Sequence, residues 1–385
     1  MKIALVSGEY PPMQGGVGDF SREIVLAWAE QGHVVSVYTD QRNQLPANET
    51  RRYQHFPIVH ADWGWRALWR LRQQLNQADV VNIQYQAAAY GKMRLPIHFL
   101  PRLLSRPTVV TFHDLRVPYL FPKAGALRTK ALQWLAQASM GVIATNPEDA
   151  HTLKHSWKLT NVREIPIGSN IPNCPPPDYA KANWRAQYGI LTGEFALGYF
   201  GFLNPSKGGE TIIAALANLL EQGVAAKLVL IGGQAGSSDP STNNAFAEEL
   251  NTLAQNLGVA DRIVRTGYLP APQTSAALLS CDLMLQPYRD GASFRRGTFM
   301  ACLNHGKPTI TTQPRVPLPQ LLHGENSWLV QADDPQQLAS AARQLLENPA
   351  LQAKLSQGAL ALSSEFGWQG IAQQTVFFFQ ESIGA

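Results

Sequence analysis

The sequence predicts an α/β protein made of two Rossmann-like domains that face each other across a cleft. The chain has 385 residues, which is too long for one ordinary hydrophobic core and fits two domains. Short apolar strands alternate with helical segments in both halves, and such repeated βα units imply parallel sheets with helices on both faces. Between the halves lies Cys174-Pro175-Pro176-Pro177, which neither a helix nor a central strand tolerates. We therefore expect domains at residues 1–172 and 190–365, joined by a linker at residues 173–189.

The first half opens with a strand at residues 2–7, a glycine-rich loop at residues 8–18 and a helix with one apolar face. Asp19 or Ser21 is expected to cap this helix. The loop lacks the GxGxxG spacing of a dinucleotide site, so a dehydrogenase with a nicotinamide cofactor is disfavoured. Further strands are predicted at residues 34–39, 80–83, 108–112 and 141–145.

The second half repeats the alternation, with a strand at residues 195–200 and a helix at residues 210–222 on either side of the loop Gly201–Gly209. Strands follow at 227–231, 263–264, 283–285, 309–311 and 328–330, with helices at 244–257, 274–279 and 297–305. The aromatic-rich residues 366–385 are expected to form a helix that packs back on the first domain.

The loop at residues 201–209 is the strongest candidate for a ligand site. Backbone N–H groups are unpaired where a helix begins, and Gly208 and Gly209 allow a ligand to approach them closely. Lys207 adds a cation at the same place. Together these features suit the two phosphates of a nucleotide-sugar, and the alternative is an ordinary βα turn with a solvated lysine.

The charge is distributed unevenly along the chain. Residues 1–175 hold 19 Lys and Arg against 12 Asp and Glu, whereas residues 176–385 hold 13 against 16. The segments 65–77 and 94–130 carry arginines among tryptophans and other apolar residues, which leaves a peripheral contact with a membrane surface open. No nucleic-acid-binding module is recognisable. Three cysteines and the lack of a secretory signal or an apolar run long enough to span a bilayer indicate a cytoplasmic protein.

Six short motifs occur in a characteristic order. They are Gly15-Gly16, Thr111-Phe112-His113-Asp114, Pro166-Ile167-Gly168-Ser169-Asn170, the loop from Gly201 to Gly208, His305-Gly306-Lys307-Pro308 and Phe366-Gly367-Trp368. In these motifs the chain resembles, over nearly its whole length, the family-four glycosyltransferases of the GT-B type. The members of that family move a sugar from a nucleotide-diphosphate donor to an acceptor with retention of configuration. The resemblance implies a donor-binding second domain and an acceptor-binding first domain.

The resemblance also assigns roles to single residues. It implies that Gly16 approaches the donor phosphates or the acceptor, that His113 contacts the transferred sugar, and that Lys207 neutralises the diphosphate leaving group. A fixed cation and N–H donors lower the barrier to departure of a diphosphate, because negative charge develops on it. For His113 the alternative is a polar residue satisfied at a strand end.

The chain departs from the family at three positions. Phe202 stands where the family usually has an arginine, and Ser293 and Ala301 stand where it has two glutamates. The pair Arg295-Arg296, at an expected helix N-terminus, can replace the missing cation because arginine suits bidentate contact with phosphate. Asp290 or Thr298 is the candidate to take over the hydroxyl contacts of the glutamates.

We therefore predict a metal-independent hexosyltransferase that binds no cofactor other than its nucleotide-sugar co-substrate and acts on a glycan or lipid-linked acceptor. The predicted catalytic residues are His113, Lys207 and Arg296. The predicted donor-binding residues are Gly15, Gly16, Phe202, Lys207, Asp290, Ser293, Phe294, Arg295, Arg296 and Thr298. Two alternatives stay open. One is a nucleotide-sugar epimerase of the same fold, with Glu9, Asp114 or Asp290 as acid and base. The other is a non-catalytic nucleotide-sugar-binding protein.

Overall fold

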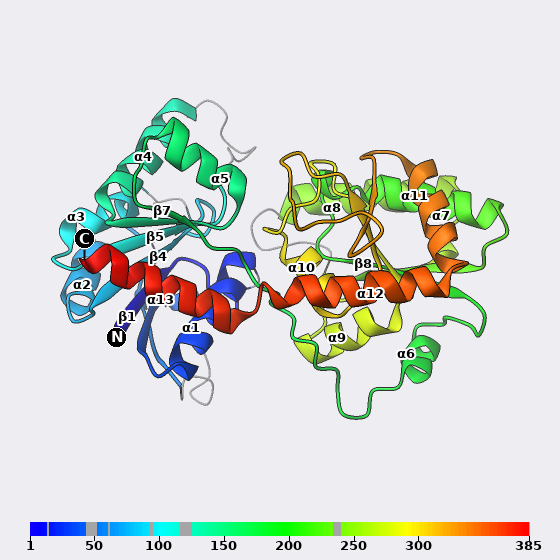
Figure 1. Ribbon diagram of the computed structural model, residues 1–385, viewed down its shortest axis with the longest axis horizontal. Helices are drawn as coiled ribbons and strands as arrows, with labels where there is room; N and C mark the ends of the chain where they lie inside the picture. The colour runs from blue at the N-terminus through cyan, green and yellow to red at the C-terminus, as the bar shows by residue number, and fades with distance from the viewer. Residues whose placement is uncertain are drawn as a thin grey trace. The chain divides into compact units, whose positions relative to one another are not determined.

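The protein consists of two compact units. The computed structural model describes residues 1–13, 15–43, 52–60, 62–91, 95–115, 125–233 and 240–384 (Figure 1). Unit 1 comprises Met1–Gly168 and Gly367–Ala385, and unit 2 comprises Ser169–Phe366. The chain thus passes from one unit to the other within two of the motifs, the Pro-Ile-Gly-Ser-Asn segment and the Phe-Gly-Trp segment. Arg94, Arg116 and Lys123 of the basic segment lie outside the described residues.

Unit 1 is built on a parallel sheet of seven strands. Their order is β3-β2-β1-β4-β5-β6-β7. Strands β2 and β3 are added on one side of β1 and the later ones on the other side, so the strand order reverses between β1 and β4. The strands are β1 (Lys2–Ser7), β2 (Val34–Asp40), β3 (Gln54–Val59), β4 (Val80–Tyr85), β5 (Thr108–Phe112), β6 (Gly141–Ala144) and β7 (Val162–Glu164). The sequence predicted five of them. It missed the two edge strands, because β3 contains a proline that only an edge tolerates and β7 is three residues long.

Helices cover both faces of this sheet. They are α1 (Gly16–Glu30), α2 (Trp65–Leu75), η2 (Pro96–Phe99), α3 (Leu100–Leu103), α4 (Gly125–Ala138), α5 (Pro147–His151) and α13 (Trp368–Gly384). Alternate residues of a strand point to opposite faces. Ile3 and Leu5 therefore pack against α1 and α13, whereas Ala4 and Val6 belong to the cluster that contains the apolar faces of α2 and α4.

Unit 2 is built on a parallel sheet of six strands in the order β10-β9-β8-β11-β12-β13. The strands are β8 (Phe195–Phe200), β9 (Ala226–Ile231), β10 (Ile263–Gly267), β11 (Leu283–Gln286), β12 (Thr309–Thr312) and β13 (Trp328–Val330). The helices are α6 (Lys181–Gln187), α7 (Gly209–Glu221), α8 (Pro240–Asn256), α9 (Ala271–Ser280), α10 (Gly297–Asn304), α11 (Pro335–Leu346) and α12 (Pro349–Ser364). Here the reversal falls between β8 and β11. The parallel sheets confirm the predicted α/β class.

The proline-rich segment and the first helix differ from the sequence-based description. Residues 173–189 pack on unit 2, where the Cys174 N–H donates to Ser275 Oγ at 3.1 Å and the Arg185 Nε–H donates to the Ser280 carbonyl at 2.9 Å. Helix α1 begins at Gly16, so Asp19 and Ser21 lie inside it and cannot cap it. The expected cap was wrong, because a residue outside the helix accepts hydrogen bonds from the N–H groups of its first turn.

Over the described part of the chain, we find no helix with the length and apolar character needed to cross a bilayer.

Candidate functional site

The topology of unit 2 brings two loops together. In an open parallel sheet the loops after two adjacent strands diverge where the strand order reverses, and ligands bind in the crevice they leave. In unit 2 these are the loop after β8, which contains Lys207, and the loop after β11, which runs to Arg296. The Arg289 N–H donates to the Ser206 carbonyl at 3.0 Å and joins the two loops.

Gly208 permits this close approach. Its φ of 70° lies in the left-handed region, and a Cβ at this position would overlap the carbonyl oxygen of Pro287. Any other residue would therefore push the loop after β8 away from the loop after β11. The glycine that the sequence assigned to phosphate approach is also required for packing.

Tyr288 lies at the centre of the site. Its side chain is fully buried, and its hydroxyl is hydrogen-bonded to Thr298 Oγ1 at 2.9 Å. Lys207 Nζ lies 5.2 Å from the centre of the Tyr288 ring, and Arg296 Cζ lies 4.2 Å from it. The ring thus attracts both cations and fixes them near each other, although they are far apart in the sequence.

Asp290 holds the arginine pair. It forms ion pairs with Arg296 and with Arg295, whose Nη2 lies 3.4 Å from Asp290 Oδ2. The three side chains are between 10% and 18% exposed. We call Lys207, Arg295, Arg296 and Asp290 the cationic cluster, because it contains three positive charges and one negative charge.

The electrostatics of the cationic cluster favour an anion. Burial, followed by repulsion from Arg296, holds the pKa of Lys207 well below its usual range, and Asp290 opposes this only in part. Helix α7 begins at Gly209, two residues after Lys207, and α10 begins at Gly297, directly after Arg296. Since helix N-termini carry partial positive charge, both add to the positive potential.

The other predicted donor residues fall into two groups. Thr298 and Phe202 lie beside the cationic cluster. The Thr298 hydroxyl is hydrogen-bonded to the Tyr288 hydroxyl, and the Phe202 carbonyl accepts a hydrogen bond from the Tyr199 hydroxyl at 3.3 Å. Ser293 shapes the turn, because its carbonyl accepts from the Arg296 N–H at 3.1 Å. Phe294 is 7% exposed and packs on Phe366 with ring centres 4.8 Å apart, so its side chain belongs to the core.

In unit 1 the carboxylate of Glu9 is hydrogen-bonded to backbone N–H groups at the end of the glycine-rich loop. Glu9 Oε1 accepts hydrogen bonds from the backbone N–H groups of Val17 at 3.0 Å and Gly18 at 2.9 Å. Glu9 is therefore the cap of α1, and a Cβ at Gly15 would overlap its carboxylate. The N–H groups of Val17 and Gly18 are thus occupied, and contact of Gly15 and Gly16 with the donor stays a prediction.

His113 is hydrogen-bonded within unit 1. Its Nε2 lies 2.7 Å from Gln84 Oε1, and Gln84 in turn donates to Asn82 Oδ1. The Phe20 ring packs edge-on against the imidazole at 4.7 Å. Burial lowers the pKa of His113 to about 3, so the imidazole is neutral at physiological pH. A neutral imidazole at this place can exchange hydrogen bonds with a sugar hydroxyl but is not a general acid.

Two residues of the site were missed in the sequence, Tyr288 and Gln84. Gln84 alternates with Asn82 in the otherwise apolar strand β4, and a polar residue that is buried in a central strand usually has a structural or functional partner. Tyr288 lies two residues after the end of β11, the strand next to β8, and could have been found from that position. Among the residues that the structure describes, no three His, Cys, Asp or Glu side chains are grouped closely enough to hold a metal ion.

The His-Gly-Lys-Pro motif has a structural role at the other end of the sheet. Lys307 Nζ donates to the Cys281 carbonyl at 2.5 Å, and His305 Nε2 is hydrogen-bonded to Ser275 Oγ at 2.8 Å. These bonds join the segment before β12 to α9 and to the start of β11. The motif thus fixes helix α10, which carries Arg296 at its N-terminus.

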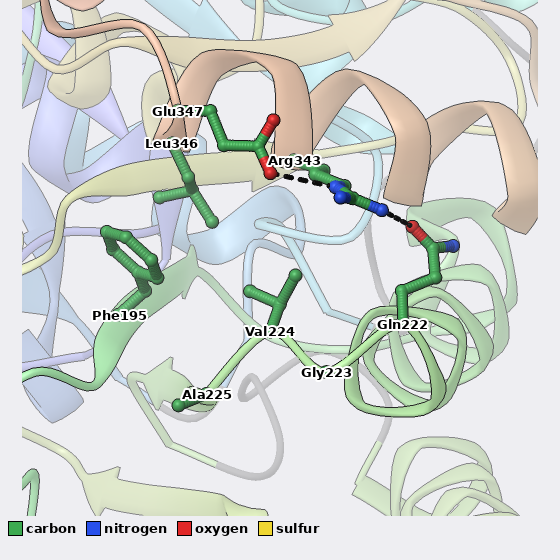
Figure 2. A pocket seen from close by; sticks show the side chains of 8 residues that line it. All are labelled: Phe195, Gln222, Gly223, Val224, Ala225, Arg343, Leu346 and Glu347. Carbon is green, nitrogen blue, oxygen red and sulfur yellow. Dashed lines mark hydrogen bonds and ion pairs between the residues drawn. The ribbon is translucent and has the colours of Figure 1, made fainter.

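A cavity of about 240 Å³ lies where β8 and β9 begin (Figure 2). The cationic cluster lies at the other end of these strands, after their carboxyl ends. Its single cation, Arg343, donates to Glu347 Oε1 at 2.8 Å and to Gln222 Oε1 at 3.4 Å. The charge of Arg343 is thus already neutralised. This cavity does not have the character of a phosphate site.

Comparison with known families assigns both halves of the chain. Residues 14–171 match the family described as Glycosyltransferase Family 4, and residues 180–361 match Glycosyl transferases group 1. The chain belongs to the family-four glycosyltransferases. The two matches meet close to the boundary between the two units.

Relatives and solved structures agree with this assignment. The glycosyltransferase is 23% identical to the alpha-monoglucosyldiacylglycerol synthase of Streptococcus pneumoniae over 330 residues, which cover 80% of this chain and 70% of the relative. It is 24% identical over 420 residues to the D-inositol 3-phosphate glycosyltransferase of Corynebacterium glutamicum, with 100% and 97% of the two chains covered. The crystal structure of Anabaena HepE in complex with UDP and glucose superimposes with a TM-score of 0.79 at 19% identity, over 99% of this chain and 100% of that one. The protein is therefore a glycosyltransferase with the GT-B fold.

Proposed function

We propose that the protein transfers a hexose from a nucleoside diphosphate to a hydroxyl of a glycan or lipid-linked acceptor, with retention and without a metal ion. The cationic cluster binds the diphosphate, and Lys207 and Arg296 stabilise it as it leaves. The observation that carries this proposal is the excess of positive charge around the buried Tyr288, with Lys207 and Arg296 both over the ring. Departure of a nucleoside diphosphate develops negative charge, which preorganised cations stabilise without reorganisation.

The cationic cluster also accounts for the family residues that this chain lacks. Arg296 supplies the cation that the family has after the first glycine of the loop, where Phe202 stands here. Asp290 is engaged with Arg295 and Arg296, so we assign to it the orientation of the arginines rather than contact with sugar hydroxyls. Thr298, beside Tyr288 at the start of α10, is the better placed hydroxyl to face the sugar.

His113 provides a hydrogen bond to the transferred sugar in this proposal. With a pKa of about 3 its imidazole is a weak base, so the acceptor proton goes to the leaving phosphate, as in front-face attack with retention. HepE was crystallised in complex with UDP and glucose, so UDP-hexoses are the first donors to test. The streptococcal relative is an alpha-monoglucosyldiacylglycerol synthase, so lipids as well as glycans are candidate acceptors. The three cysteines are free, which fits the reducing cytoplasm.

A donor panel tests the proposal. The purified protein is mixed with UDP-, GDP-, ADP- and dTDP-hexoses, with EDTA or with added Mg²⁺ or Mn²⁺, and release of nucleoside diphosphate is followed together with thermal stability. We expect one diphosphate to stabilise the protein and its sugar donor to be hydrolysed slowly in EDTA. NMR of the transferred sugar then reports its anomeric configuration.

Other outcomes contradict parts of the proposal. Binding without release under any acceptor mixture would identify a non-catalytic binding protein, and conversion of one donor sugar to its epimer would identify an epimerase. Release that occurs only with added metal would contradict the metal-independent reaction. If no nucleotide binds at all, the assignment of the cationic cluster is wrong.

A further inference from the structure

The nine tryptophans of the chain are distributed unevenly between core and surface. Trp65, Trp69 and Trp134 are 51%, 60% and 47% exposed, whereas the other six are buried or half-buried. All three exposed tryptophans lie in unit 1, on α2 and α4. A large aromatic side chain gains most from burial, so three of them together on one surface indicate an interaction site.

The exposed rings form a continuous surface. The Trp65 ring on α2 lies 5.2 Å from the Phe99 ring at the end of η2, and Phe99 lies 5.2 Å from the Trp134 ring on α4. Trp69 follows Trp65 by one helical turn, and Leu127, which is also exposed, lies on the same face of α4 as Trp134. Helices α2, α3 and α4 follow one another along one side of unit 1 (Figure 1).

Arginines accompany the rings. Arg102 Cζ lies 4.9 Å from the centre of the Trp134 ring, and Arg72 Cζ lies 5.2 Å from that of Trp69. Arg66 and Arg70 are exposed next to Trp65 and Trp69. We call Trp65, Trp69, Phe99, Arg102 and Trp134, with the exposed arginines of α2, the aromatic-arginine surface.

Acidic residues are absent from the elements that form this surface. Helices α2, α3 and α4 and the segment η2 contain no Asp or Glu, although they contain Arg66, Arg70, Arg72, Arg102, Arg128 and Lys130. The acids next to α2 in the sequence are Asp62, whose Oδ1 accepts from the Gly64 N–H, and Asp79, whose Oδ2 accepts from the Lys2 N–H. The partner of the aromatic-arginine surface must therefore be apolar and negatively charged.

We propose that the aromatic-arginine surface docks on an anionic lipid surface. Indole and guanidinium groups together suit the boundary between headgroups and acyl chains, because the ring enters the apolar side and the cation meets lipid phosphates. Helix α2 presents Trp65, Arg66, Trp69 and Arg70 along its exposed side and lies in the plane of the headgroups. A second copy of this chain is disfavoured, because a two-fold contact would place like charges against each other. The proposal adds a membrane attachment site in unit 1 to the diphosphate binding assigned to the cationic cluster of unit 2.

Vesicle sedimentation with the full-length protein tests this proposal. One set of vesicles is pure phosphatidylcholine, and the other also contains phosphatidylglycerol. We expect binding to the anionic vesicles only, and weaker binding as salt is added. Arg66→Gln combined with Arg70→Gln is expected to lower the partition coefficient roughly 25-fold, at about fivefold for each charge. Trp65→Ser and Trp69→Ser are each expected to lower it roughly tenfold.

Two control variants remove an exposed aromatic residue or an exposed positive charge at positions outside the aromatic-arginine surface. Phe377→Ser removes an aromatic residue that is 54% exposed on α13, and Lys354→Gln removes an exposed charge from α12. Both should bind vesicles like the wild type. Lipids with brominated acyl chains should quench tryptophan fluorescence of the wild type, and less so in Trp65→Ser. All variants should bind nucleoside diphosphate like the wild type, which separates this proposal from the assignment of the cationic cluster.

Three outcomes would overturn the proposal. The first is equal binding to neutral and anionic vesicles. The second is loss of vesicle binding in the control variants to the same extent as in the arginine and tryptophan variants. The third is no vesicle binding together with self-association that Trp65→Ser abolishes, which would assign the surface to a second copy of the chain.

Discussion

Replacement of Lys207 by methionine is expected to change donor binding and stability in opposite directions. Lys207 provides one of the three cations against the single carboxylate of Asp290, so its loss halves the excess positive charge of the cationic cluster. A hydrogen bond from a charged group contributes about 2 kcal/mol net, which corresponds to a roughly 30-fold weaker affinity for nucleoside diphosphate.

The free protein should respond in the opposite way. The pKa of Lys207 is lowered from 10.5, mainly by burial and next by Arg296, so the folded protein binds this proton less tightly than the unfolded chain does. The contribution of Lys207 to the free energy of unfolding therefore rises with pH between the folded pKa and 10.5. Below that window the buried charge is destabilising. At any pH below 10.5 the wild type lacks part of this contribution, and the Lys207→Met variant does not carry that deficit. The variant should therefore melt at a higher temperature than the wild type at neutral pH in the absence of ligand.

Titration calorimetry with UDP and thermal unfolding at several pH values measure both effects. Arg343→Met is the matched control, since it removes the same charge from the same unit at the opposite edge of the sheet (Figure 2). The control should keep its UDP affinity. If Lys207→Met bound UDP like the wild type, or if it melted at a lower temperature than the wild type, the account of the cationic cluster as an anion site would be refuted.

Three further predictions concern the other site residues. Arg296→Lys keeps the charge but loses the planar fork, so UDP affinity should fall about tenfold, which calorimetry measures against the wild type. Gly15→Ala should cost about 1 kcal/mol of unfolding free energy in a denaturant titration because its Cβ displaces the Glu9 cap, whereas Gly16→Ala, with open space around it, should cost nothing. His113→Ala should lower the rate of transfer about tenfold through a lost hydrogen bond. With a pKa of about 3, His113 should leave the pH-rate profile between pH 5 and pH 8 unchanged, and a titration that disappears in His113→Ala would contradict its neutral role.

The sequence predicted most of the secondary structure because its signals are local. Apolar runs of strand length, the loop glycines and the helical spacing of Ile212, Ile213 and Leu216 can be recognised without knowledge of their partners. Elements without such signals were missed. Helices α11 and α12 received no prediction. The edge strands were missed because β3 contains a proline and β7 is only three residues long.

The sequence by itself determined the fold class, the order of the motifs and the cations available for a phosphate site, since these follow from residue type and spacing. Only the tertiary structure decided which of these residues meet. Lys207 and Arg296 share the Tyr288 ring because β8 and β11 are neighbours in the sheet, and Glu9 caps α1 because the loop folds back on itself. Likewise, the exposure of Trp65, Trp69 and Trp134 depends on which helix faces the sheet has already covered. Contacts of this kind depend on how elements pack in space, and spacing along the chain does not encode them.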